Sequence, residues 1–223
     1  MSATCSIRIP PPTVRSACIA VGLMLLASCG VLPKREPMQV FELRPVASPA
    51  GSAAWPQANW SLLVTKPTAG HQLESDSIAV RPAPGVLQVY KSASWTDSVP
   101  DLLQTTLLHT FEDSGKILSV SRPGGGIRGQ YQLLTEVRAF ESEYQDGQPH
   151  AVTEVYAKLI QTSSGKVVAA RSFRESEPAA GTEVGAVVDA FSRSLGRLSS
   201  AIAGWTLTEG SRQAPEPAAT KQR

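Results

Sequence analysis

The stretch 131-YQLLTEVRAFESEYQDGQPHAVTEVYAKLIQTSSGKVVAARSF-173 decides the fold, because apolar and polar residues alternate along three successive runs. Asp146-Gly147 and Ser164-Gly165 separate the runs, and such pairs can supply tight turns. Consecutive strands joined by short turns pair antiparallel. The stretch therefore predicts an antiparallel meander, with strands starting at Tyr131 and covering Val152–Ile160 and Val167–Phe173.

Short strand-like runs separated by prolines come before this meander. The predicted strands are Gln39–Arg44, Trp60–Lys66, Ser77–Arg81 and Val86–Lys91. Proline is expected at strand ends because it cannot donate a ladder hydrogen bond, and Pro67, Pro82 and Pro84 fit those places. Residues 45–57 are rich in Pro, Ala, Ser and Gly, and they predict a loop.

The spacing of apolar residues changes between the early strands and the meander. Apolar residues from Val99 to Phe111 fall three or four apart, which predicts one helix with an apolar stripe. Asp97 or Ser98 can cap its start, and Pro100 suits a first helical turn, where its missing N–H costs nothing. Gly115 can end the helix in a left-handed conformation.

A second helical stripe runs from Val184 to Trp205. The element order predicts an α+β fold, in which a twisted, largely antiparallel sheet carries two amphipathic helices packed on one face. We expect this single domain to cover residues 38–208. Residues 209–223 are mostly polar, Ala and Pro, and predict a disordered tail.

The first 28 residues have the layout of a secretory signal. Arg8 and Arg15 precede the apolar run Ala17–Ala27, which at about 11 residues is shorter than the roughly 20 that span a bilayer. Small residues then lead to Ser28 and Cys29, as in a bacterial lipobox. This similarity implies cleavage between Ser28 and Cys29 and lipidation of Cys29. The alternative is an ordinary cysteine beside an uncleaved anchor.

A lipidated mature protein would be held at a membrane, because several acyl chains anchor where one holds only marginally. Residues 29–37 would then form the lipidated cysteine and its tether. Gly30 stands where similarity to inner-membrane lipoproteins would require Asp, so we expect the outer membrane, with the domain facing the periplasm.

The charge balance bears on the class of partner. Without Arg8 and Arg15 the chain keeps 19 of its 21 Lys and Arg residues, against 19 Asp and Glu. Nucleic-acid binding needs a basic surplus to neutralise phosphates, so we expect no nucleic-acid partner.

Two features of the sequence are candidates for a cofactor or metal site. Residues 124–129 match the letters of a dinucleotide fingerprint, but a strand pattern follows where that site needs a helix, so a loop is favoured. His71, His109 and His150 lack any close metal-ligand spacing. We therefore expect neither a cofactor nor a metal.

Two carboxylate pairs are candidates for acid-base catalysis. Glu112-Asp113 and Glu141 with Glu143 could do such work, but they are more often solvated edges. No Gly-x-Ser-x-Gly elbow occurs, although a triad assembled across the fold stays open. The sequence therefore favours a protein without enzymatic activity.

Trp95, Asp97 and Pro100 flank the start of the first predicted helix and are the candidates for contact with a partner. Tryptophan is enriched among the residues that dominate interface energies. In the alternative interpretation, Trp95 is partly buried under the helix start.

Several short motifs together resemble the ABC-type transport auxiliary lipoprotein family, over most of the mature chain. They are Phe41-x-Leu43-x-Pro45, Ile78-Ala79-Val80-Arg81-Pro82, Leu87-x-Val89-Tyr90, Trp95 to Pro100, Leu102-Leu103, Leu107-Leu108, Phe111, Ser114-Gly115, Val120 and Tyr131-x-Leu133. The family tends to have Tyr where this chain has Phe41.

The resemblance implies a non-catalytic helper of mammalian-cell-entry (MCE) lipid transporters. It would dock an MCE-domain protein and its ABC permease and ATPase, or hand over lipid, through the sheet edge or the Trp95 region. The alternatives are an assembly lipoprotein of another envelope machine and a periplasmic hydrolase. Direct lipid binding and self-association stay open.

Overall fold

The structure is a computed structural model that describes residues 37–45, 53–124 and 126–213. The predicted signal peptide, Ser28, Cys29 and nearly all of the tether lie outside the described residues, as do residues 214–223. The description below concerns the unit that begins at Met38.

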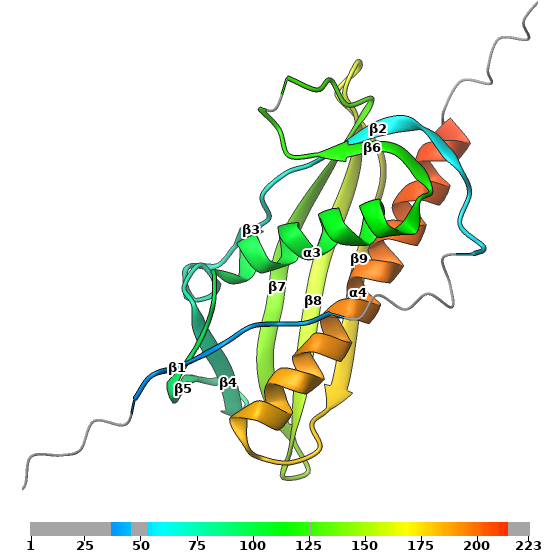
Figure 1. The fold of residues 1–223 in the computed structure, drawn as a ribbon. Helices are drawn as coiled ribbons and strands as arrows, with labels where there is room; N and C mark the ends of the chain where they lie inside the picture. The colour runs from blue at the N-terminus through cyan, green and yellow to red at the C-terminus, as the bar shows by residue number, and fades with distance from the viewer. Residues whose placement is uncertain (1–36, 46–52, 125, 214–223) are drawn as a thin grey trace, which may run out of the picture. The chain divides into compact units, whose positions relative to one another are not determined.

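The chain forms an α+β fold, as predicted, in which two helices pack on one face of a nine-stranded mixed sheet (Figure 1). The elements are, in chain order, β1 (Gln39–Phe41), β2 (Ala58–Val64), β3 (Thr68–Ala69), a 3₁₀ turn (His71–Leu73), β4 (Ser77–Ala83), β5 (Val86–Trp95), α3 (Val99–Ser114), β6 (Ile117–Ser121), β7 (Tyr131–Gln145), β8 (Gln148–Gln161), β9 (Lys166–Pro178) and α4 (Val184–Gln213).

The 15-residue strand β7 organises the sheet. On one side it pairs antiparallel with β8, which pairs with β9, so the predicted meander is confirmed. On the other side it pairs in parallel with β2, β3 and β4 in turn. The sequence did not predict these parallel pairings, because the partner strands lie far apart in the chain.

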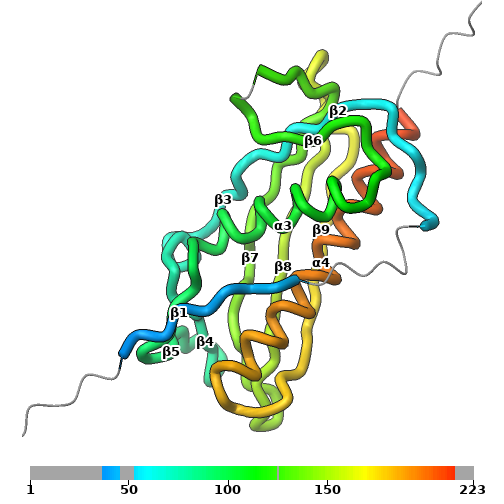
Figure 2. Tube along the Cα trace, in the orientation of Figure 1, coloured from blue at the N-terminus to red at the C-terminus, as the bar shows by residue number. Residues whose placement is uncertain are grey.

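On this side of β7, different strands therefore pair with its two ends. Its first residues pair with β2, and Tyr131 lies opposite Leu62. Near its other end Ser142 lies opposite Val80 of β4, which continues to β5 and β1. Tyr131 and Ser142 are eleven residues apart, or about 36 Å along a strand. We call these two regions the Tyr131 end and the Ser142 end; Figure 2 shows β2 and β6 at the first and β1, β4 and β5 at the second.

Helix α3 begins and ends as the sequence predicts. Ser98 is the N-cap residue with an extended backbone, and Pro100 follows in the first turn. Gly115 ends the helix at φ 60° and donates its N–H to the carbonyl of Glu112. The helix then returns the chain to β6, which lies parallel to β2 at the Tyr131 end.

Helix α4 continues through Gln213, so the disordered tail predicted for residues 209–223 was placed too early in the sequence. Thr206, Leu207 and Gly210 are buried, which explains why the helix persists beyond the apolar stripe read from the sequence. The remainder of that predicted tail lies outside the described residues. In the part of the chain that the structure describes, we find no helix long and apolar enough to cross a membrane.

The core at the Ser142 end is aromatic. Trp95 makes edge contacts with Phe140 and Phe191, with ring centroids 6.0 and 5.3 Å apart, and the two phenylalanines stack at 4.8 Å. Such contacts add to the free energy gained by burying the rings. Nearby, the hydroxyls of Thr153 and Ser194 pair at 2.8 Å, which fixes α4 on β8.

Candidate functional site

A groove of about 1320 Å³ lies at the Tyr131 end of the sheet. Its lining comes from four separate parts of the chain: the region around β2, the end of the loop before β7, the turn between β8 and β9, and the last turn of α4. The lining residues are Gln57, Asn59, Trp60, Leu63, Ile127, Arg128, Gly129, Gln130, Tyr131, Gln161, Thr162, Ser163 and Ser211.

Trp60 and Tyr131 form the base of the groove, with ring centroids 4.9 Å apart in an edge contact. Both rings are almost fully buried. Gly210 of α4 makes room for the indole, because a Cβ at that position would lie 2.4 Å from Trp60 Cζ2. The base is therefore held by close packing between β2, β7 and α4.

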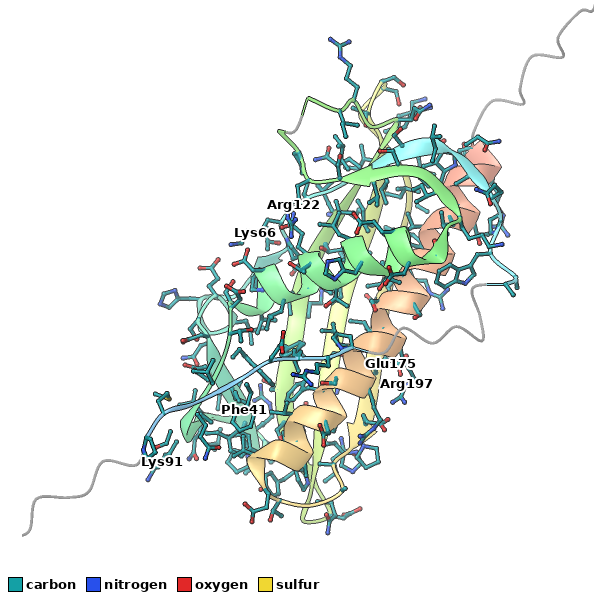
Figure 3. All side chains as sticks on the ribbon, in the orientation of Figure 1. Phe41, Lys66, Lys91, Arg122, Glu175 and Arg197 are labelled. Carbon is teal, nitrogen blue, oxygen red and sulfur yellow. The ribbon has the colours of Figure 1, made fainter. Side chains whose placement is uncertain are left out.

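The loop that forms one wall is held where it begins. Arg122 donates hydrogen bonds to Gln104 Oε1 at 3.2 Å and to Thr105 Oγ1 at 3.0 Å, both on α3. Gln104 is itself fixed, because its amide donates to the carbonyl of Val64 at 2.9 Å. Figure 3 labels Arg122 beside α3.

The same loop is also held where it ends. Gln130 Oε1 accepts the N–H of Ser61 at 2.6 Å, and its carbonyl accepts the N–H of Thr162 at 2.9 Å. Gly129 lies so close to β2 that a Cβ would be 2.6 Å from Leu63 Cγ and 2.9 Å from the Tyr131 carbonyl oxygen. These contacts preform the wall of the groove.

Two polar atoms at the groove lack partners among the described residues. They are Trp60 Nε1 and Ser211 Oγ, which are both buried. A buried donor without a partner costs roughly 1–3 kcal/mol, so such groups in a native fold call for an explanation. Both atoms are shut off from solvent, so a molecule in the groove would reach them only if the side chains around them moved.

The electrostatics of the groove are simple. Among the described residues that line it, Arg128 is the one fully charged side chain, and the other polar groups are amides and hydroxyls. Burial raises the pKa of the Tyr131 hydroxyl above its ordinary value of 10.0, so this phenol stays protonated at neutral pH. The groove therefore combines an apolar base with a neutral to weakly positive rim.

The structure places the predicted partner-contact residues differently. Trp95 is only 1% exposed and ends β5, so it is a core residue rather than an exposed anchor. Pro100 is also buried, because it faces the core from the first turn of α3. Asp97 is exposed, and partner contact at this residue stays a prediction.

The two carboxylates of the predicted pair on β7 each form an ion pair with a different arginine. Glu141 is buried and accepts two hydrogen bonds from Arg81, at 2.7 and 3.0 Å. Glu143 lies 3.5 Å from Arg174, which also pairs with Glu154 at 2.7 Å. The first ion pair joins the neighbouring strands β4 and β7, and the second reaches from β7 across β8 to β9, which gives both carboxylates a structural explanation. Glu112 and Asp113 are exposed at the end of α3.

The glycine-rich segment joins β6 to β7, so a strand follows it where a dinucleotide site would need a helix. Gly125 lies outside the described residues. The three histidines are dispersed over the 3₁₀ turn, α3 and β8. Within residues 37–45, 53–124 and 126–213, no three His, Cys, Asp or Glu side chains gather in a way that could hold a metal.

Sequence reasoning missed the groove because its lining residues come from distant segments. The local pattern predicts Trp60 only as the start of a strand, although a tryptophan next to two amides, Gln57 and Asn59, is a signal that could have drawn attention to it. Gly210 gave a second hint, since a glycine costs helix stability and its presence in α4 asks for a packing reason.

The fold and the groove define a small α+β domain with a preformed, ligand-sized hollow at one end of its sheet. The chain belongs to the family described as the ABC-type transport auxiliary lipoprotein component, whose sequence profile matches residues 41–203. Its family is therefore one of lipoproteins that accompany ABC transporters, and the resemblance drawn from the sequence is confirmed.

Solved structures share the fold. Protein XCC0632 from Xanthomonas campestris is 40% identical, with a TM-score of 0.74, and the match covers 78% of this chain and 97% of that one. The structure of an uncharacterized protein is 17% identical, with a TM-score of 0.59 over 75% and 97% of the two chains. At that identity the second likeness concerns the fold alone.

A relative from Bradyrhizobium diazoefficiens, the uncharacterized protein bll6063, is 30% identical over 147 residues. The match covers 66% of this chain and 39% of the relative, so the chain spans about two fifths of that protein's length.

Proposed function

We propose that this protein is a lipid-anchored auxiliary component of an MCE-type ABC transporter, held at the outer membrane and facing the periplasm. It acts without catalysis, by docking the MCE-domain protein with its permease and ATPase and by handing over lipid. The observation that carries the proposal is the family match over residues 41–203.

The place where the described domain begins agrees with this role. Cys29 would attach the domain through residues 29–37, a segment that reaches about 28 Å when fully extended. The segment leads into β1, which belongs to the Ser142 end through β5 and β4. The groove lies at the Tyr131 end. A partner from the periplasm could therefore reach the groove at the end remote from the attachment point.

The test is an affinity purification of the tagged full-length protein from detergent-extracted membranes, with proteins identified by mass spectrometry. We expect the MCE-domain protein and its permease to co-purify. Cys29→Ala is the matched control, and it should leave the outer-membrane fraction while keeping its fold.

Recovery of another envelope machine in place of the transporter would overturn the proposal and favour an assembly role. Recovery of wild-type protein in the inner membrane would contradict the predicted location while leaving the choice of transporter untouched.

A further inference from the structure

We infer that the groove at the Tyr131 end binds one acyl chain of a lipid and holds the oxygen-rich head of that lipid at Arg128. This inference rests on the proposed function in one respect only, which is the source of the lipid. The binding itself follows from the shape and chemistry of the groove.

The apolar part of the groove suits an acyl chain. Leu63 is half-buried and Ile127 is 46% exposed, and both line the groove, so aliphatic surface borders the hollow. The walls are fixed by the close contacts of Gly129 and the hydrogen bonds of Gln130. A preformed apolar hollow binds a flexible chain without first having to be ordered itself.

A sugar ligand is less well matched, although the rim is rich in amides. A sugar ring stacks on the open face of an aromatic side chain, whereas Trp60 and Tyr131 are 3% and 2% exposed. Trp60 contacts the edge of Tyr131 on one side and packs against Gly210 on another. The base therefore offers no open ring face, and the accessible apolar surface is aliphatic.

The polar groups of the groove point to acceptor oxygens on the ligand. Trp60 Nε1 and Ser211 Oγ are shut off from solvent, so neither atom faces a ligand in the groove. Arg128 is exposed at the groove and donates from a cation, and no carboxylate lines the described part of the groove. Ester carbonyls, a carboxylate or a phosphate provide the complementary acceptors.

The test places the photo-crosslinker p-benzoylphenylalanine at Ile127 in the full-length protein and irradiates intact cells. The matched control places it at Leu118, which is 68% exposed on β6 and lies outside the groove lining. Trypsin cleaves after Lys116 and Arg128 but not between Arg122 and Pro123, so both positions fall on one peptide. Adducts at the two positions can therefore be compared directly by mass spectrometry.

We expect acyl-lipid adducts at Ile127 to be several-fold more abundant than at Leu118. The adduct mass separates a phospholipid from a free fatty acid, and either one supports the inference. Equal adducts at both positions would mean mere closeness to a membrane and would overturn it. Adducts with a sugar, with a peptide of this chain or with no lipid at all would overturn it too.

A second variant tests the head-group contacts without disturbing the apolar wall. Arg128→Gln should weaken retention of an anionic lipid on the purified protein and leave its thermal unfolding unchanged, because Arg128 is exposed. If the transporter co-purifies but no lipid adduct forms, the groove inference fails while the proposed function stands. If adducts form without the transporter, the reverse holds.

Discussion

A buried tryptophan packs against each end of β7, Trp60 from β2 and Trp95 from β5, and the two have different surroundings. Trp95 at the Ser142 end and Trp60 at the Tyr131 end both make edge contacts with aromatic rings of β7. In both, the indole N–H has no partner among the described residues. Trp95 is closed in by Phe140 and Phe191, whereas Trp60 lines a groove. Burial alone therefore does not mark a functional residue.

The difference between the ends follows from what α4 supplies. At the Ser142 end it presents Phe191, which fills the space over β7. At the Tyr131 end it presents Gly210, which lets Trp60 approach the helix backbone, and Ser211, which faces the groove. One helix thus closes one end of the sheet and leaves the other open.

The largest expected effect is a difference in stability cost between replacing Trp95 in the core and replacing Trp60 at the groove. Trp95→Ala should cost about 3–5 kcal/mol, because it removes a fully buried ring that contacts two others. Trp60→Ala should cost less, since one side of that ring borders a groove. Denaturant unfolding of both variants measures the difference. If Trp95→Ala unfolds at the wild-type denaturant concentration, the Ser142 end is not the closed core described above.

A smaller effect tests the close approach of Trp60 to α4. Gly210→Ala should lower stability by about 1–2 kcal/mol, because the added methyl overlaps the indole. Gly185→Ala on the same helix meets nothing within 4 Å, so it should raise stability by up to about 1 kcal/mol through helix propensity. Thermal melts of the pair compare them. Equal shifts in melting temperature would show that Trp60 moves aside to make room for the methyl group.

A pH-dependent effect concerns the ion pairs that hold α4 at the Ser142 end. Hydrogen bonds from Arg197 and Arg193 lower the pKa of Glu177 below its ordinary 4.5; Figure 3 labels Arg197 with its other partner, Glu175. The lowered pKa gives stability that is present above pH 4.5 and lost as the pH falls through the folded pKa.

Glu177→Gln should therefore cost about 1 kcal/mol at pH 7, a modest value because the arginines are partly exposed. The difference from wild type should shrink as the pH drops below 4.5. Chemical unfolding at a series of pH values measures it, and a cost that is constant with pH would rule out the charge effect.

Local patterns in the sequence predicted the meander, both helices and the turn at Asp146, where φ is 50°. Ser98, Pro100 and Gly115 marked the limits of α3 because caps depend on neighbouring residues. The parallel pairing of β7 with β2 and β4 was missed, since register between distant segments leaves no local trace. The groove was missed for the same reason, and the burial of Trp95 depends on Phe191, almost a hundred residues away.

The most direct test of the account compares two exposed apolar residues in one preparation. Ile127→Asp and Leu118→Asp would each be purified as full-length protein, and the co-purifying MCE-domain protein and acyl lipid would both be quantified. We predict that Ile127→Asp retains about tenfold less lipid than the wild-type protein, because a charge replaces apolar contact in the groove. The same variant should still co-purify with the transporter. Leu118→Asp should keep both. Lipid retained equally by the two variants, or a transporter absent from the wild-type preparation, would contradict the account.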